Sequence, residues 1–158
     1  MRWTPFRNYH ATLVFLGATP HAEVERIGAQ LRAVTAGWPP IHAAAGGVSG
    51  AIRRKGSGVA WLQIGAGRQA LSDLSLRLHH ALQNGTDASR QTPHVTLARR
   101  VDRAVLEELG GALPEVELAW VFTRVVLYRS HTTSLGSHYE ELAGTALAGD
   151  LTGGRGAD

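Results

Sequence analysis

The sequence has no cysteine, one methionine and one lysine among its 158 residues. Without cysteine, the chain has no disulfide, no thiolate ligand for a metal and no cysteine nucleophile. A chain without disulfides fits a reducing compartment, so we expect a cytoplasmic protein. Long apolar runs are also missing, because none approaches the roughly 20 residues that a membrane-spanning helix needs. We therefore expect no membrane partner.

The scarcity of lysine leaves arginine as the carrier of nearly all the positive charge. Lysine and arginine together number 16, against 13 aspartates and glutamates, which gives a formal net charge of +3. The planar guanidinium group is better suited than an ammonium group to paired hydrogen bonds with phosphate oxygens. This mild excess permits a nucleic acid or a nucleotide as substrate but does not require one.

Hydrophobic spacing and turn residues predict a mixture of strands and helices. Strands are expected over residues 9–16, 41–48, 59–64, 94–100, 116–128 (as one strand or two) and 136–143. Helices are expected over residues 20–36, 68–83 and 103–110, and loops over the basic, glycine-rich residues 50–58 and the polar residues 84–92. This order is typical of an α+β fold. We expect one domain over residues 1–148 and a disordered, glycine-rich tail over residues 149–158.

One short motif occurs twice, as His10-Ala11-Thr12-Leu13 and as His94-Val95-Thr96-Leu97. Alternate side chains of a strand share a face. Each motif therefore presents an imidazole and a hydroxyl group side by side, with apolar residues behind them. If the two strands lie close together, the four polar groups meet in one cleft.

This set of groups suits the hydrolysis of a phosphodiester. One imidazole can take a proton from the attacking water while the other gives a proton to the leaving oxygen. The hydroxyls of Thr12 and Thr96 can donate to the non-bridging phosphate oxygens. The structural alternative is a pair of strand histidines satisfied by local hydrogen bonds, but the matched pair favours catalysis. A third copy, His131-Thr132-Thr133, lacks the alternating apolar residues, so we expect a loop there.

The residues around both motifs carry a family resemblance. Segments 8–17 and 92–99 contain the motifs, and segment 125–130, followed by Gly136 and Tyr139-Glu140, matches a C-terminal segment of the family. Up to about residue 147, the sequence resembles the two-histidine phosphoesterase superfamily. It is most similar there to the RNA 2',3'-cyclic phosphodiesterases, also called 2'-5' RNA ligases.

The resemblance implies a two-lobed, duplicated fold in which antiparallel sheets line a central cleft and helices lie on the outside. Family members usually begin with a strand and a helix before the segment that matches Arg2-Trp3, so we expect this first strand and helix to be missing. The resemblance also implies hydrolysis of a 2',3'-cyclic phosphate, on RNA ends or nucleotides, to a 2'-phosphate. It implies His94 as the base and His10 as the acid. Some relatives also join RNA ends through a 2'-5' bond.

Further residues are candidates for substrate binding. The resemblance implies that Arg99 binds phosphate, but strict alternation from His94 turns Arg99 to the opposite face. Arg99 can serve only if the strand ends or bulges there, whereas Arg100 has the right parity. The remaining candidates are charged or aromatic: Arg53 and Arg54 in the glycine-rich loop, Arg129, Tyr139, Trp61 and Tyr128. The other histidines lack the spacing of a metal site, so we expect no metal and no cofactor.

Two other functions stay open. The same chemistry could act on 2'-5' oligoadenylates or on small cyclic nucleotides. Alternatively, a non-catalytic module could bind RNA or nucleotides in the same cleft. Binding alone needs no proton-transfer pair, so His10 and His94 argue against such a module. The sequence makes no prediction of the oligomeric state.

Overall fold

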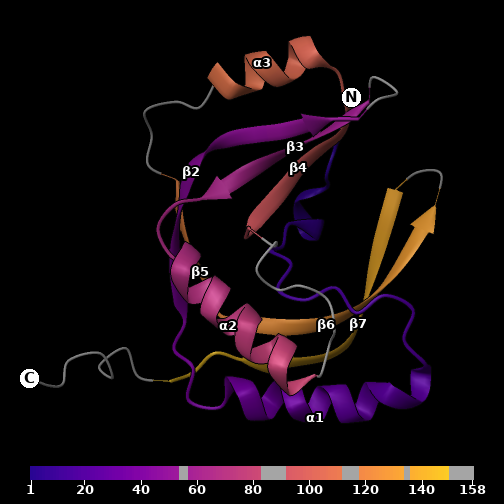
Figure 1. Cartoon of the computed structure of the whole chain (residues 1–158), viewed down its shortest axis with the longest axis vertical. Coiled ribbons are helices and arrows are strands. Elements are labelled where there is room, and N and C mark those ends of the chain that lie inside the picture. The colour runs from indigo at the N-terminus through magenta and orange to yellow at the C-terminus, as the bar shows by residue number, and fades with distance from the viewer. Residues whose placement is uncertain (54–56, 83–91, 112–117, 134–135, 150–158) are drawn as a thin grey trace, which may run out of the picture.

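The computed structural model describes residues 1–53, 57–82, 92–111, 118–133 and 136–149, which contain both strands and helices (Figure 1). The described strands are β1 (Arg2–Trp3), β2 (Ile41–Ile52), β3 (Gly58–Ile64), β4 (His94–Val101), β5 (Ala119–Phe122), β6 (Arg124–Thr133) and β7 (Gly136–Ala146). The described helices are α1 (Val24–Thr35), α2 (Arg68–Ala81) and α3 (Arg103–Gly111), with two short 3-10 turns, η1 (Phe6–Asn8) and η2 (His21–Glu23). None of these described helices is long and apolar enough to cross a membrane.

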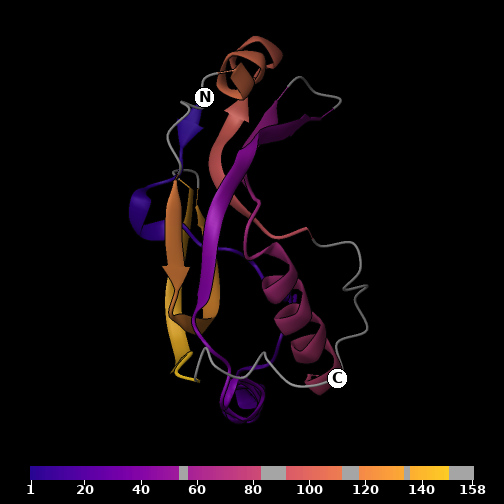
Figure 2. The ribbon, with the colours of Figure 1, turned by 90° about the vertical axis from the view of Figure 1, so that its left-hand side faces the viewer.

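The strands form two antiparallel sheets. Five strands lie in the order β1-β4-β3-β2-β5, and β6 pairs with β7 in a separate hairpin. The long strand β2 pairs with β3 over residues 45–52 and with β5 over residues 41–44. A bulge at Gly46 lies where one pairing gives way to the other. Because a bulge bends and twists a strand, the larger sheet curls (Figure 2). Antiparallel sheets with helices packed against them confirm the expected α+β fold class.

The helices cover different parts of the sheets. α1 packs against the β6–β7 hairpin and against α2, with Ile27 and Leu31 buried. Leu74 and Leu78 of α2 are also almost fully buried in this main core. α3 contacts β2 at the opposite end of the molecule from α1 (Figure 1). A second, smaller cluster lies there, formed by Ala60, Ala98 and Val101 with Val105, Leu106 and Leu109 of α3.

The strand expected over residues 9–16 is wrong. Its one strand-like contact is an isolated antiparallel bridge between Ala11 and Val95. The residues have strand propensity, but a strand needs a continuous ladder with a neighbour. Among the described residues, β4 offers this segment a partner at one position only. The Leu13 carbonyl instead accepts a hydrogen bond of 2.6 Å from Ser75 Oγ of α2.

One expected loop is shorter than predicted and another is wrong, because strands run further than predicted. β2 continues to Ile52 and β3 begins at Gly58, so both ends of the loop expected over residues 50–58 lie in strands, and residues 54–56 lie outside the described residues. The segment His131-Thr132-Thr133 lies in β6, where pairing with β7 supplies the ladder that its own sequence does not suggest.

The other predicted elements agree with the structure to within a few residues, and residues 116–128 contain two strands. The loop expected over residues 84–92 lies almost entirely outside the described residues, as does the tail over residues 149–158. Gly149, the last described residue, donates its N–H to the carbonyl of Trp38.

Candidate active site

The two His-x-Thr motifs meet across one antiparallel bridge. Ala11, in the middle of the first motif, is bridged to Val95, in the middle of the second. In antiparallel pairing, the residues on either side of such a pair also face each other. Each histidine therefore lies opposite the threonine of the other motif. The structure brings four side chains to one cleft: His10, Thr12, His94 and Thr96.

Both histidine rings are fixed in the same way. His10 Nδ1 lies 2.8 Å from the carbonyl oxygen of Asn8, and His94 Nδ1 lies 2.9 Å from that of Thr92. A carbonyl oxygen only accepts hydrogen bonds, so Nδ1 carries the proton in each ring. In a neutral imidazole of this tautomer, Nε2 holds the lone pair. Each motif thus offers Nε2 as a base when its ring is neutral and as an acid when its ring is protonated.

Arg99 shares the face of the histidine because β4 contains a bulge. At Leu97 the strand β4 has one residue more than its partner β3, which shifts the alternation of side chains by one. Arg99 therefore faces the same side as His94 and Thr96, and it lines the cleft. Arg100 has left-handed backbone, with a φ of 56°, and does not line the cleft. The bulge that the sequence required for Arg99 is present.

Aromatic rings surround the two histidines unequally. The His10 ring meets the edge of Tyr139 at a centroid distance of 4.9 Å, and Tyr128 lies 6.5 Å away. The His94 ring instead lies 5.5 Å from Trp61. These contacts restrict the rotation of both imidazoles. They also make the two rings inequivalent, which is a physical basis for distinct acid and base roles.

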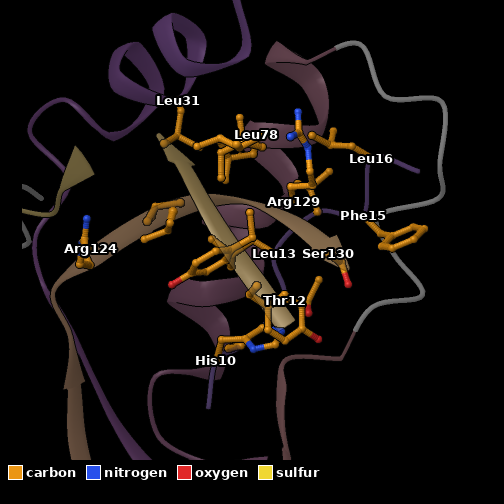
Figure 3. A pocket seen from close by; sticks show the side chains of 18 of the residues that line it. His10, Thr12, Leu13, Phe15, Leu16, Leu31, Leu78, Arg124, Arg129 and Ser130 are labelled. Carbon is orange, nitrogen blue, oxygen red and sulfur yellow. The ribbon is translucent and has the colours of Figure 1, made fainter. Parts of the chain in front are cut away.

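The cleft has a volume of about 900 Å³ and is polar at one end. Figure 3 shows His10, Thr12 and Ser130 gathered at this end, whereas Leu31 and Leu78 line the other. The polar side chains can donate hydrogen bonds to a phosphate group, and the apolar lining nearby strengthens interactions between charges. The polar end therefore suits a phosphate group whose charge must be stabilised during a reaction.

A charged network on the β6–β7 hairpin holds Arg129 beside the cleft. Arg129 Nη1 lies 3.6 Å from the Glu140 carboxylate, and Nη2 donates to His21 Nδ1 at 2.9 Å. A 2.8 Å hydrogen bond from His131, and then the charge of Arg129, lower the pKa of Glu140. The role of His21 was not predicted, because a lone histidine at the entry to α1 belongs to no motif.

Of the two arginines predicted in the glycine-rich loop, Arg53 does not join the site. Arg53 lies at the tip of the β2–β3 hairpin, where its N–H donates to the carbonyl of Ser57. This tip is level with Val101, at the opposite end of β4 from His94. The length of β4, on the order of 20 Å, separates the two. Arg53 therefore does not reach a phosphate held at His94, and Arg54 lies outside the described residues.

The groups that the cleft gathers are proton carriers, hydroxyl donors and arginines. Within the described parts of the chain, no three His, Asp or Glu side chains are placed to hold a metal ion together. The arrangement is suited to acid–base chemistry on a phosphate ester, in which protons move through imidazoles and the phosphate oxygens receive hydrogen bonds.

Known proteins share this architecture. The family model described as the 2'-5' RNA ligase superfamily matches residues 3–134. An RNA 2',3'-cyclic phosphodiesterase of Geobacillus stearothermophilus is 27% identical over 152 residues, which cover 93% of this chain and 48% of that protein. The chain thus spans about half the length of this relative.

Two solved structures share the fold at low sequence identity. TT0787 of Thermus thermophilus matches with a TM-score of 0.70 and 24% identity, over 94% of this chain and 83% of that one. E. coli LigT in its apo form matches with a TM-score of 0.64 and 23% identity, over 93% and 80% of the two chains.

Proposed function

Because the chain belongs to the 2'-5' RNA ligase superfamily, we propose that it is a phosphodiesterase that opens 2',3'-cyclic phosphates at RNA ends. His10 and His94 act as the acid–base pair. The observation that carries this proposal is that both rings make the same hydrogen bond: each Nδ1 bonds to the carbonyl oxygen of the residue two positions earlier. Two rings with the same tautomer on one cleft suit a proton relay through two Nε2 atoms.

In the proposed reaction, water attacks the phosphorus atom and the bond between phosphorus and O3' breaks. His94 Nε2, neutral at the start, takes a proton from the water, and the protonated His10 Nε2 gives its proton to O3'. The product carries a 2'-phosphate and a free 3'-hydroxyl group. The reaction leaves His94 protonated and His10 neutral, and proton exchange with solvent restores both rings.

Hydroxyl and guanidinium groups stabilise the negative charge that develops on the non-bridging phosphate oxygens. Thr12 and Thr96 donate to the non-bridging oxygens, and Arg99 adds a charge-assisted hydrogen bond on the same face of β4. If the 5'-hydroxyl group of another RNA takes the place of water, the same steps join the two ends through a 2'-5' bond.

The test uses a short RNA that ends in a 2',3'-cyclic phosphate. We expect the wild-type protein to add one water and to leave a 2'-phosphate on the RNA end, identified by mass spectrometry and by chromatography against 2'- and 3'-phosphate standards. His10→Ala serves as the control for contaminating nucleases. An unchanged cyclic phosphate would reject the proposal, and a 3'-phosphate product would show that O2' leaves.

The same assay separates the alternative substrates. 2'-5' oligoadenylate and small cyclic nucleotides are run beside the RNA at equal concentration. A preference for either would show that the protein acts on that substrate class, and the proposed role of the two histidines would stay the same. Binding of all three substrates without turnover would instead indicate a non-catalytic module.

A further inference from the structure

The carbonyls that bond to the two histidines differ in what fixes their direction. Thr92, whose carbonyl bonds to His94, is followed by Pro93, and a residue before proline is restricted to extended backbone. Asn8, whose carbonyl bonds to His10, is followed by a tyrosine, which imposes no such restriction. The direction of the Asn8 carbonyl therefore depends on other contacts of this residue.

The half-buried Asn8 makes two such contacts. Its backbone N–H donates to the carbonyl of Pro5 at 2.8 Å, within the short turn η1. Its side-chain Nδ2 donates to the carbonyl of Ser137 in β7 at 3.0 Å. The N–H, the side-chain amide and the carbonyl of Asn8 thus each form a hydrogen bond. The residue is fixed relative to both the turn before it and the distant strand β7.

The strand that receives the Asn8 amide also contacts the His10 ring. Tyr139 lies two residues after Ser137 in β7, just as His10 lies two residues after Asn8. The edge of the Tyr139 ring meets the imidazole at a centroid distance of 4.9 Å. β7 therefore contacts the first motif at two points, one through the Asn8 side chain and one through the His10 ring.

The second motif obtains the same restraint from backbone pairing. His94 and its aromatic neighbour Trp61 lie on β4 and β3, which pair along a ladder. Among the described residues, β7 forms a ladder with β6 and none with the first motif. The hydrogen bond between Asn8 and Ser137 holds the first motif against β7 where no ladder does.

We propose that Asn8 is a positioning residue for His10, an inference that rests on the proposed function. Its side-chain amide, by bonding to β7, keeps the Asn8 carbonyl directed at His10 Nδ1. In the neutral ring this bond keeps the proton on Nδ1, and in the protonated ring it fixes the direction of Nε2–H. Asn8 does not line the cleft and acts through the imidazole alone.

The test compares two variants that differ in the amide donor. Asn8→Leu has a side chain of similar size without a donor, whereas Asn8→Gln keeps the amide on a longer side chain. With a short RNA that ends in a 2',3'-cyclic phosphate, Asn8→Leu should lower kcat by roughly 10- to 100-fold. KM should stay within about twofold, because Asn8 does not contact the substrate. Asn8→Gln should lose less of kcat than Asn8→Leu.

Nuclear magnetic resonance of isotopically labelled histidine provides a second readout. The nitrogen chemical shifts of a neutral imidazole show which ring nitrogen carries the proton, and the His10 signals are those that His10→Ala lacks. In the wild-type protein, we expect the proton on Nδ1 of both His10 and His94. In Asn8→Leu, part of the His10 population should carry it on Nε2, while His94 should not change.

Gln30→Leu is the matched control for a merely structural role. Gln30 Nε2 donates to the carbonyl of Ala81 at 2.8 Å, which is also a half-buried bond from a side-chain amide to a distant backbone carbonyl. Gln30 does not line the cleft. Gln30→Leu should lower Tm about as much as Asn8→Leu does, but it should leave kcat and the His10 signals unchanged. Equal losses of kcat in the two variants would overturn the inference.

The spectra separate this inference from the proposed function, because they need no turnover. If the wild-type protein opens no cyclic phosphate but Asn8→Leu moves the His10 proton, only the proposed function fails. If the wild-type protein is active and Asn8→Leu changes neither kcat nor the His10 signals, the positioning role is rejected. A lower kcat with unchanged His10 signals would also reject it, since the loss would then not act through the ring.

Discussion

At the scale of single residues, the proposed catalysis depends on which ring nitrogen of each histidine carries a proton. The two backbone carbonyls fix Nδ1–H in both rings, so in the proposed mechanism Nε2 is the atom that exchanges a proton with the substrate. We expect His10→Ala and His94→Ala each to lower kcat by roughly 10²- to 10⁴-fold with little change in affinity. The double variant should be scarcely worse than either single variant, because the two rings act as a unit. Single-turnover kinetics measure these values.

The third histidine motif offers a control for this prediction. His131 bonds to Glu140 and does not line the cleft, so His131→Ala should leave turnover nearly unchanged. Thr12→Ala and Thr96→Ala should cost less than loss of a histidine, since each removes one donor from a phosphate that keeps others. An equal loss in His131→Ala and His94→Ala would contradict the two-histidine mechanism.

Arg99 and Arg100 form a matched pair of neighbours that the bulge turns in different directions. Arg99→Ala should lower kcat/KM by roughly tenfold or more, because it removes a charge-assisted hydrogen bond to the phosphate. Arg100→Ala removes the same charge from a side chain outside the cleft, and should stay within about twofold. Steady-state kinetics at two salt concentrations check both. If Arg100→Ala is the more damaging change, the face assigned to Arg99 is wrong.

The sequence predicted which residues line the site better than it predicted how they are arranged. The repeat of His-x-Thr singled out the four side chains that the cleft gathers. The alternation rule also stated what Arg99 would need, but the bulge at Leu97 follows from the register of β3 and β4, which the sequence does not contain. His21 and the two carbonyl anchors carry no signal in the sequence, because they depend on contacts between segments.

At the scale of elements, strand propensity gave wrong predictions where the presence or absence of a pairing partner determines whether a strand forms. Residues 9–16 have a strand-like composition, yet the segment pairs at Ala11 only. Residues 131–133 have no such composition, yet they lie in β6 because β7 pairs with them along their whole length. Propensity describes the segment alone, whereas a ladder needs two segments.

The start of α2 provides a test of how the sheet positions a helix. Gly67 has a φ of 80°, and an added Cβ would lie 2.4 Å from the carbonyl oxygen of His42 in β2. Gly67→Ala should therefore lower the free energy of unfolding by roughly 1–3 kcal/mol. Gly110→Ala in α3 meets no atom of the described residues outside its own helix backbone within 4 Å, and should instead be neutral or stabilising, by up to about 1 kcal/mol. Urea unfolding of both variants measures the difference, and equal values would contradict the close approach.

The β6–β7 hairpin makes a prediction about pH. The pKa of Glu140 lies below its ordinary value of 4.5, first through the hydrogen bond from His131 and then through the charge of Arg129. A carboxylate with a lowered pKa contributes stability above the ordinary value, and this contribution is lost as the pH falls through the lowered one. Glu140 therefore stays ionised throughout the range in which histidines titrate.

We expect a bell-shaped pH–rate profile from the histidine pair, since one ring must be neutral and the other charged. Glu140→Gln should keep both limbs of this profile. The stability difference between Glu140→Gln and wild type should shrink as the pH falls below 4.5. Rates and thermal melts across the acidic and neutral range measure both. Loss of the acid limb in Glu140→Gln would show that the carboxylate, and not an imidazole, is responsible for it.

At the scale of the whole molecule, the sequence predicted the fold class but not the order of the strands. Alternating helical and strand patterns indicate an α+β fold, and the structure has one. The central place of β3, between β4 and β2, follows from pairings between distant segments, which composition and spacing do not reveal. The family resemblance implied the sheet-lined cleft, and the solved structures that are similar to this chain share its fold.

The contact between the two motifs makes a prediction about the stability of the whole chain. Only one backbone bridge, between Ala11 and Val95, joins the described residues of the two motifs directly, and the motifs lose contact with each other when the chain unfolds. A phosphate bound by both motifs therefore binds the folded protein alone. At a concentration about 100 times its Kd, a nucleoside 2'-phosphate should raise the free energy of unfolding by about 2.7 kcal/mol. For a chain of this length, Tm should rise by roughly 5–10 °C, as measured by differential scanning calorimetry.

The control for this linkage weakens the binding of the shared ligand and leaves the bridge intact. The double variant Thr12→Ala and Thr96→Ala loses one phosphate donor from each motif, while the backbone pair and the anchored rings remain. At the same nucleotide concentration its Tm should rise much less than that of wild type, whereas without the nucleotide the two proteins should melt within a few degrees of each other. An equal rise in both proteins would mean that the nucleotide binds elsewhere, and that the cleft between the motifs is not where the phosphate lies.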